Sequence, residues 1–244
     1  MHEEQIRLNP RIEAESEDTF LQGVKDCIPT LLGYWSIGFA AGVIEQTAGL
    51  SVAEIALLSL LLYAGSAQFI AAGMIASSPP SVIVITIFFV NLRHLLLSAA
   101  LSPYLRHLSP LRNMGIGALL TDETFGVAMN KALVQPRLSE RWMHGLNVAA
   151  YLNWLFANLA GAYLGRWITD PERFGLDYAL PAMFIGLLVL MTVSRKQVAM
   201  DSAVAVLAAL IAIAVSLSLG GSWGVIAATV TASAIGVVIE RWKR

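Results

Sequence analysis

The sequence predicts an all-α fold, a polytopic bundle of about eight transmembrane helices that includes broken helices. Of its 244 residues 57% are hydrophobic and 14% are charged, and the mean hydropathy is +0.66. Soluble domains carry roughly a quarter charged residues. Apolar runs of about 20 residues, enough to cross a ~30 Å hydrocarbon layer, recur along the chain. These runs are continuous and do not alternate with a period of 2, so they do not predict a transmembrane barrel.

The apolar segments are separated by short stretches in which Pro, Gly, Ser and Asp form turns. The eight segments cover residues 27–44, 52–76, 82–102, 114–131, 145–167, 178–193, 202–219 and 223–240. Residues 1–26 are polar and acid-rich. We therefore expect a cytoplasmic N-terminal tail over 1–26, followed by one membrane domain over 27–244.

The positions of Lys and Arg predict the orientation, because basic residues are enriched in cytoplasmic loops. With the N-terminus inside and eight spans, eleven basic residues lie inside and four outside, Arg93 being within the membrane. The four outside are Arg106, Arg112, Arg166 and Arg173. Seven spans would move the basic C-terminal end outside and leave eight against seven. We expect both termini in the cytoplasm, with seven spans as the alternative.

Composition also narrows the classes of partner and cofactor. The net charge of −1, without a basic stripe, gives no indication of a nucleic-acid partner. The single Cys27 excludes an intramolecular disulfide and a cysteine-based metal site. The chain has no Walker A motif and no His-Glu-x-x-His motif. We expect no metal, no cofactor, no catalytic residues and no hydrolysis of ATP.

Ionisable residues lie in the middle of two apolar segments. Arg93 is near the centre of 82–102, and Asp122 and Glu123 lie within 114–131. Each such charge costs at least ~2.5–3.5 kcal/mol at the bilayer centre unless it is paired or reaches water. We interpret these side chains as part of a transport site. The alternative is a buried ion pair that only fixes helix register.

The stretch "TDETF" is typical of a helix start. Thr121 is a favoured N-cap residue, and Asp122 and Glu123 suit the positive end of the helix dipole. A helix that begins at mid-depth predicts a broken helix, and many secondary transporters build their substrate sites from such helices. Pro29 and several glycines make the segment 27–44 equally easy to bend.

The stretch "NLRH" places three polar residues close together. On an ideal helix Asn91 and His94 are about 60° apart, whereas Arg93 is about 160° from Asn91. The three therefore share a narrow face only if the helix is unwound there. His94 is a candidate proton carrier, and an interior histidine bonded to a carbonyl is an equally good interpretation.

Other polar residues have ordinary packing interpretations beside functional ones. Ser66 and Gln68 can hydrogen-bond across helices where Gly65 allows close approach. We expect packing roles for Tyr151, Asn153, Trp154 and Asn158. The pairs Gly38–Gly42 and Gly161–Gly165 match a helix-association face and leave a homo-oligomer possible. "AGSAQF" and "TDETF" each precede an Asn-bearing segment, which leaves a duplicated two-helix unit as a hypothesis.

Four motifs in order, "P…G" (Pro29, Gly33), "AGSAQF", "NLRH" and "TDETF", resemble the AzlC-like family of bacterial branched-chain amino-acid exporters. The resemblance extends from about residue 20 to the C-terminus. It implies the large permease subunit of the bacterial inner membrane, a small membrane partner of the AzlD type, and efflux of leucine, isoleucine, valine and related amino acids. The positions it carries over are Gly65, Ser66, Gln68, Phe69, Asn91, Arg93, His94, Thr121, Asp122 and Glu123.

We therefore expect a secondary transporter of small zwitterions with apolar side chains. Arg93 or the N-terminus of a half-helix would hold the carboxylate, and Asp122 or Glu123 would take the ammonium or a coupling proton. Phe69 and Phe88 would flank the side chain. The expected substrate-binding residues are Gly65, Ser66, Gln68, Phe69, Asn91, Arg93, Thr121 and Asp122, and the expected proton-coupling residues are His94, Asp122 and Glu123.

Two other classes of function stay open at this point. One is a channel or an assembly subunit of a membrane complex. The other, which we favour less, is an intramembrane hydrolase that uses Ser66 and His94.

Overall fold

The computed structural model describes residues 18–168, 170–193, 198–219, 228, 230–232 and 234–239, and every regular element among them is a helix. The all-α prediction is confirmed. The chain forms two compact units, one ending at Met183 and the other beginning at Phe184. The second unit contains the end of α9, α10 (Val198–Leu219) and helical residues within 230–239. Residues 1–17 of the predicted tail, and residues 223–227, 229, 233 and 240 of the last predicted segment, lie outside the described residues.

The first unit contains all of the predicted site. Its helices are α2 (Phe20–Thr47), α3 (Val52–Leu57), α4 (Gly65–Met74), α5 (Pro80–Leu101), α6 (Pro110–Ala118), α7 (Asp122–Ala132), α8 (Glu140–Leu164) and the start of α9 (Ala179–Val193). A π-helical turn, Leu58–Leu62, continues α3, and 3-10 turns cover Ser102–Leu105, Gly165–Trp167, Glu172–Phe174 and Leu176–Tyr178.

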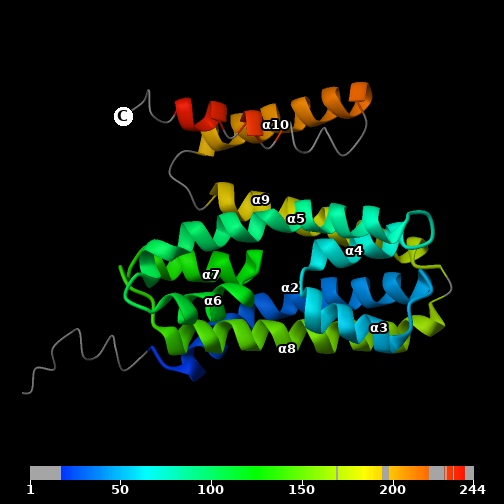
Figure 1. The fold of residues 1–244 in the computed structure, drawn as a ribbon, viewed down its shortest axis with the longest axis horizontal. Coiled ribbons are helices and arrows are strands. Elements are labelled where there is room, and N and C mark those ends of the chain that lie inside the picture. Colours follow the sequence, from blue (N-terminus) through cyan, green and yellow to red (C-terminus); the bar gives the residue numbers. More distant parts are fainter. Residues whose placement is uncertain are drawn as a thin grey trace, which may run out of the picture. The chain divides into compact units, whose positions relative to one another are not determined.

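Helices α2 and α8 pack side by side and run parallel (Figure 1). Gly23 of α2 meets the Trp142 backbone near the start of both helices, and Gly42 meets the Asn158 backbone near their ends. A Cβ at Gly42 would lie 2.1 Å from the Asn158 carbonyl oxygen, so only glycine permits this approach. Helix α2 has 28 residues and stays helical through Pro29. It begins at Phe20, earlier than the hydropathy pattern predicts.

Residues 52–74 form a re-entrant hairpin. Helix α3 leaves the end of α2, and its π-helical turn reaches Tyr63, which packs with Tyr34 and Trp154 near the middle of α2 and α8. The chain then turns back along α4. Gln68 of α4 lies 3.3 Å from Ser59 on the outgoing arm, so the two arms run side by side. Tyr63 has a positive φ of 43°, a strained conformation for a bulky residue.

Helices α6 and α7 form a second hairpin, which enters from the other end of the unit (Figure 1). Its outer ends are tied to the starts of α8 and α2, because Arg112 pairs with Glu140 at 3.3 Å and Lys131 pairs with Asp18 at 2.5 Å. Helix α7 has 11 residues. At 1.5 Å per residue such an arm reaches about half of a ~30 Å layer.

The hairpins revise the predicted spans. The broken helix predicted at Thr121 is confirmed: Thr121 is extended, and its hydroxyl accepts a hydrogen bond from the Thr124 N–H. Each of the segments 52–76 and 114–131, however, turns back instead of crossing as one span, and the break after Tyr63 was not predicted. An apolar stretch of this length suits one span or two half-length arms equally well, so hydropathy does not separate them.

Three described helices are long and apolar enough to cross a membrane. They are Phe20–Thr47, Pro80–Leu105 and Val198–Ser218. The two hairpins contradict a single crossing for 52–76 and for 114–131, and these three helices do not by themselves give the number of spans.

The second hairpin also corrects the predicted sides of two connections. The sequence analysis placed 102–113 and 132–145 on opposite sides, but the Leu138 N–H donates to the Tyr104 carbonyl at 3.2 Å, so both connections lie at one end. That end carries Lys25, Arg106, Arg112, Lys131, Arg137 and Arg141. The other end of the unit carries Arg166 and Arg173. The revised distribution still favours a cytoplasmic N-terminus, which stays a prediction.

The core of the first unit has two clusters. One joins the starts of α2 and α8 to the second hairpin and contains the fully buried Trp142, Met143 and Leu146. The other lies at mid-depth around Tyr34 and Trp154 and receives the tip of the first hairpin. Together they hold both hairpin tips against the α2–α8 pair.

Replacing Gly42 by Ala should weaken the packing of α2 on α8. The added methyl group meets a backbone oxygen that moves only with its helix, so we expect a loss of roughly 1–3 kcal/mol of stability. Thermal unfolding of the detergent-solubilised protein measures it. The matched control is Gly33→Ala on the same helix, where an added Cβ has nothing within 4 Å. Equal effects of the two substitutions would contradict the close approach.

Candidate functional site: a mid-depth pocket between two hairpin tips

One guanidinium joins the tips of the two hairpins. Arg93 of α5 places Nη1 2.8 Å from Oδ2 of Asp122, in the first turn of α7. Its Nη2 donates a hydrogen bond of 2.7 Å to the hydroxyl of Ser66, in the first turn of α4. The Arg93 and Asp122 side chains are 23% and 20% exposed, so the pair is not sealed in the interior.

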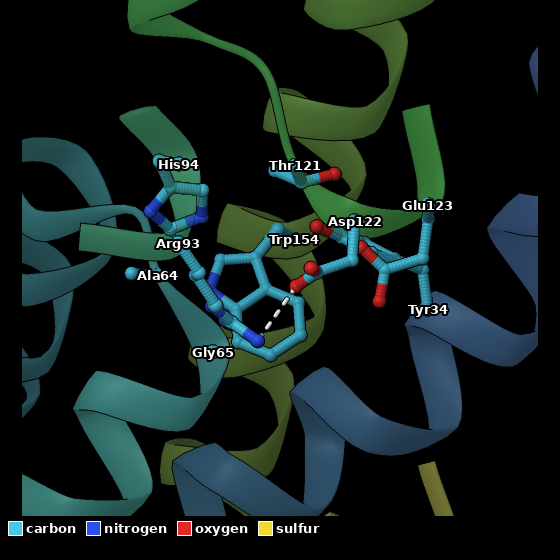
Figure 2. Close-up of a pocket in the computed structure, with 9 residues that line it drawn as sticks. All are labelled: Tyr34, Ala64, Gly65, Arg93, His94, Thr121, Asp122, Glu123 and Trp154. Atoms are coloured by element: carbon cyan, nitrogen blue, oxygen red, sulfur yellow. Dashed lines mark ion pairs between the residues drawn. The ribbon is translucent and has the colours of Figure 1, made fainter. Parts of the chain in front are cut away.

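These residues border a small pocket (Figure 2). It is lined by Tyr34, Ala64, Gly65, Arg93, His94, Thr121, Asp122, Glu123 and Trp154. Its free space is about that of a single water molecule. In this conformation the pocket is too small to hold a molecule the size of an amino acid. Among the described residues, no group of three His, Cys, Asp or Glu side chains could hold a metal ion.

The two helix starts at the pocket differ in how they are capped. Helix α7 begins with a capping box between Thr121 and Thr124 and carries Asp122 and Glu123 in its first turn. Helix α4 follows Ala64, and no side chain among the described residues caps its start. Its first N–H groups therefore add to the positive charge of Arg93. The pocket thus has a positive side and a negative side.

Aromatic side chains of α2 and α8 complete the pocket. The Tyr34 and Trp154 rings meet edge to face, with centroids 5.0 Å apart. A Cβ at Gly65 would lie 2.8 Å from the Trp154 ring, so the indole rests directly on the start of α4. Figure 2 shows Glu123 beside Tyr34. The sequence analysis gave Trp154 a packing role and did not single out Tyr34, an aromatic hydroxyl in the middle of an apolar run.

The predicted site residues fall into three groups. Gly65, Arg93, His94, Thr121, Asp122 and Glu123 line the pocket. Ser66 does not line the pocket but hydrogen-bonds to Arg93, which does. Gln68 and Phe69 are buried and do not line the pocket. Asn91 does not line the pocket. Helix α5 is continuous through "NLRH", so the helical geometry separates Asn91 from Arg93 as expected.

The expected role of Phe88 is wrong. Its side chain is 61% exposed and stacks edge to face on Phe89, with the ring centroids 5.7 Å apart. It lies on the outer face of α5, so it does not flank the pocket. The aromatic side chains that do line the pocket are Tyr34 and Trp154.

A second polar cluster lies behind the pocket. Gln68 Nε2 lies within hydrogen-bond distance of three oxygens, at 3.0 Å from Glu45 Oε1, 3.3 Å from Ser59 Oγ and 3.2 Å from Asn158 Oδ1. Trp154 Nε1 donates to Gln68 Oε1 at 2.7 Å. We call these five side chains the Glu45 cluster.

The sequence analysis missed Glu45 because the apolar run ends at Ile44, so the residue was counted in a loop. Helix α2 continues to Thr47, and Glu45 is fully buried. One signal could have found it. Gly38, Ala41, Gly42 and Glu45 follow one another at helical spacing, which puts the carboxyl on the face of small residues that packs against the protein.

Residues 29–168 match the model of the AzlC family, described as AzlC protein. The chain belongs to the AzlC family. Every residue that lines the pocket lies within the matched range. The predicted resemblance to this family is therefore confirmed over residues 29–168.

Three proteins similar to this chain carry the names of membrane or transport proteins. The inner membrane protein YgaZ of Escherichia coli is 30% identical over 190 residues, 75% of this chain and 77% of YgaZ. An uncharacterized membrane protein of Archaeoglobus fulgidus is 34% identical over 172 residues, 69% of this chain and 74% of that one. The branched-chain amino acid transport protein AzlC of Bacillus subtilis is 25% identical over 178 residues, 70% and 66% of the two chains. No solved structure matches the chain.

The Arg93–Asp122 pair should stabilise the contact between α5 and the second hairpin. In a double-mutant cycle of Arg93→Gln and Asp122→Asn, we expect a coupling of about 1–3 kcal/mol, because each single variant leaves a partly buried partner without its ion pair. Thermal unfolding in detergent measures the coupling. The matched control is Arg112 with Glu140, 62% and 29% exposed, which should couple by less than about 1 kcal/mol. Additive effects at the Arg93 pair would contradict its energetic role.

Proposed function

We propose that the protein is a secondary transporter that exports branched-chain or similar aliphatic amino acids across the bacterial inner membrane. An ion gradient drives it, and it acts as the large subunit beside a small AzlD-like membrane partner. The observation that carries the proposal is the pocket at which Arg93 and Asp122 hold two hairpin tips together. The name of the Bacillus subtilis relative supports the class of substrate.

The pocket complements an α-amino acid through its two charged sides. The carboxylate of the substrate takes the place of Asp122 on the Arg93 guanidinium and accepts hydrogen bonds from the start of α4. Asp122 and Glu123 then face the ammonium. The aliphatic side chain packs against the Trp154 ring. Binding thus exchanges one internal ion pair for two pairs with substrate, which limits the net cost of removing the charges from water.

The hairpins supply the means of alternating access. They enter from opposite ends of the unit (Figure 1), and residues at both tips line the pocket. Withdrawing one tip opens the pocket toward one side while the other tip keeps it closed, as in transporters built from discontinuous helices. Asp122, Glu123 and His94 lie at this point and are the expected carriers of a coupling proton.

The two alternative functions, a hydrolase and a channel or assembly subunit, would each require different features of the site. A hydrolase would need a base to activate the hydroxyl of Ser66, but that hydroxyl accepts a hydrogen bond from Arg93, which is no base. A channel or assembly subunit would need no saturable site. Leucine flux that saturates and follows a gradient in vesicles would exclude a plain channel.

Replacing Arg93 by Ala should abolish export while the protein still inserts. The substrate carboxylate then loses its main cation, and a lost charge-assisted bond of about 1.5–3 kcal/mol corresponds to a drop of roughly 10- to 150-fold, before the cost of leaving Asp122 without its partner. Efflux of labelled leucine from vesicles, normalised to inserted protein, measures it. The control is Arg112→Ala, an exposed arginine away from the pocket. Normal transport by a properly folded Arg93→Ala variant would discard this role.

A further inference from the structure

Glu45 is a carboxyl group placed deep in a membrane protein without an ionic partner. Its side chain is 0% exposed, and its hydrogen-bond partner is the neutral amide of Gln68. Oε2 of the same carboxyl group has no hydrogen-bond partner. Ionisable side chains buried inside a membrane protein often mark ion or proton pathways.

The orientation of the Gln68 amide is fixed. The Trp154 indole N–H can only donate, and it donates to Gln68 Oε1. Nε2 of Gln68 therefore faces the oxygens of Glu45, Ser59 and Asn158. The partner that the Glu45 carboxyl group has in this cluster is thus an N–H donor on one oxygen, and Oε2 has none.

A fully buried Glu45 without an ionic partner is best accommodated as the neutral acid. The neutral acid offers an O–H group at the oxygen that has no partner, and it removes the cost of burying an uncompensated negative charge. The groups facing Glu45 are uncharged: Ser59 from the π-helical turn, Gln68 from α4 and Asn158 from α8. Within residues 18–168 no Lys, Arg or His pairs with Glu45. Glu54, the acidic residue at the start of α3, is exposed and bonds Ser51.

We propose that Glu45 is a proton-binding site of the transport cycle, separate from the pocket, and that Gln68 transmits its protonation state to the substrate site. This inference rests on the proposed function and deepens it by naming a site for the coupling ion. The proton moves from water on one side to the Glu45 carboxylate and leaves to water on the other side, so no other reactant is needed. The amino acid leaves the cell while the proton enters it, so the two move in opposite directions.

Two contacts connect the cluster to the pocket. Gln68 lies one helical turn after Gly65 in α4, the helix whose start carries Ser66 and its bond to Arg93. Gln68 also accepts from Trp154, whose ring rests on Gly65 and lines the pocket. When Glu45 loses its proton, it becomes a buried negative charge that attracts the N–H groups of the Gln68 amide. Because Gln68 belongs to α4, this attraction moves α4.

The test compares coupled transport with exchange in vesicles that contain the full-length protein. Glu45→Gln imitates the neutral acid but cannot release a proton. We expect leucine transport driven by a pH gradient to fall at least about tenfold, and leucine–leucine exchange, which needs no proton release, to stay within about twofold. The matched control, Glu54→Gln, changes an exposed acidic residue and should leave both rates unchanged.

The outcomes of this experiment distinguish failure of the inference about Glu45 from failure of the proposed function. Gradient-driven transport that persists in Glu45→Gln overturns the inference, and so does an equal loss of exchange in folded protein, because a purely structural residue behaves that way. If the unsubstituted protein neither exchanges nor accumulates leucine, the proposed function fails instead.

A second variant covers the case in which Glu45→Gln does not insert. Glu45→Asp keeps a titratable group but shortens it by one methylene, so its distance from Gln68 changes. We expect coupled transport to continue with a shifted pH profile. A profile identical to that of the unsubstituted protein overturns the inference.

Discussion

A guanidinium at mid-depth in a membrane protein is the constraint on which the rest of the first unit depends. Arg93 needs an anion, and Asp122 reaches it only because α7 begins in the middle of the unit. A helix that begins there must come from a hairpin or a broken span, since irregular backbone survives at that depth only against protein or a water-filled cavity. The parallel α2–α8 pair supplies that protein surface, through glycines that no larger residue can replace.

Each of the two hairpins follows a long helix in a similar way. Helix α2 leads into the first hairpin, and α5, which runs the opposite way, leads into the second. The stretches "AGSAQF" and "TDETF" begin the returning arms, α4 and α7. The repeated arrangement is a helix followed by a hairpin, which is larger than the two-helix unit suggested by the sequence, and duplication stays a hypothesis. Inverted repeats with discontinuous helices at their interface are a common plan of secondary transporters.

The cap at the start of a helix was predictable from the sequence, whereas the places where the chain reverses direction were not. The Thr121 cap and its acidic first turn follow from short-range rules, so the start of α7 was predicted correctly. The turn at Tyr63 has no such signal, because Ala64 offers no capping side chain. Hydropathy measures length in lipid and cannot distinguish a span from two half-length arms. Glu45 was missed for a related reason, since polarity marks a loop unless the helical face is followed past the apolar run.

The central claim is that substrate reaches the charged pocket between the hairpin tips. Ala64 lies at the first tip and lines that pocket. The most direct measurement is labelling of Ala64→Cys, in a Cys27→Ser background, by a small membrane-impermeant thiol reagent applied to vesicles, with and without leucine. The account predicts labelling from at least one side and protection by leucine but not by a dicarboxylic amino acid. A thiol that labels from neither side, or labels equally with leucine present, would contradict it.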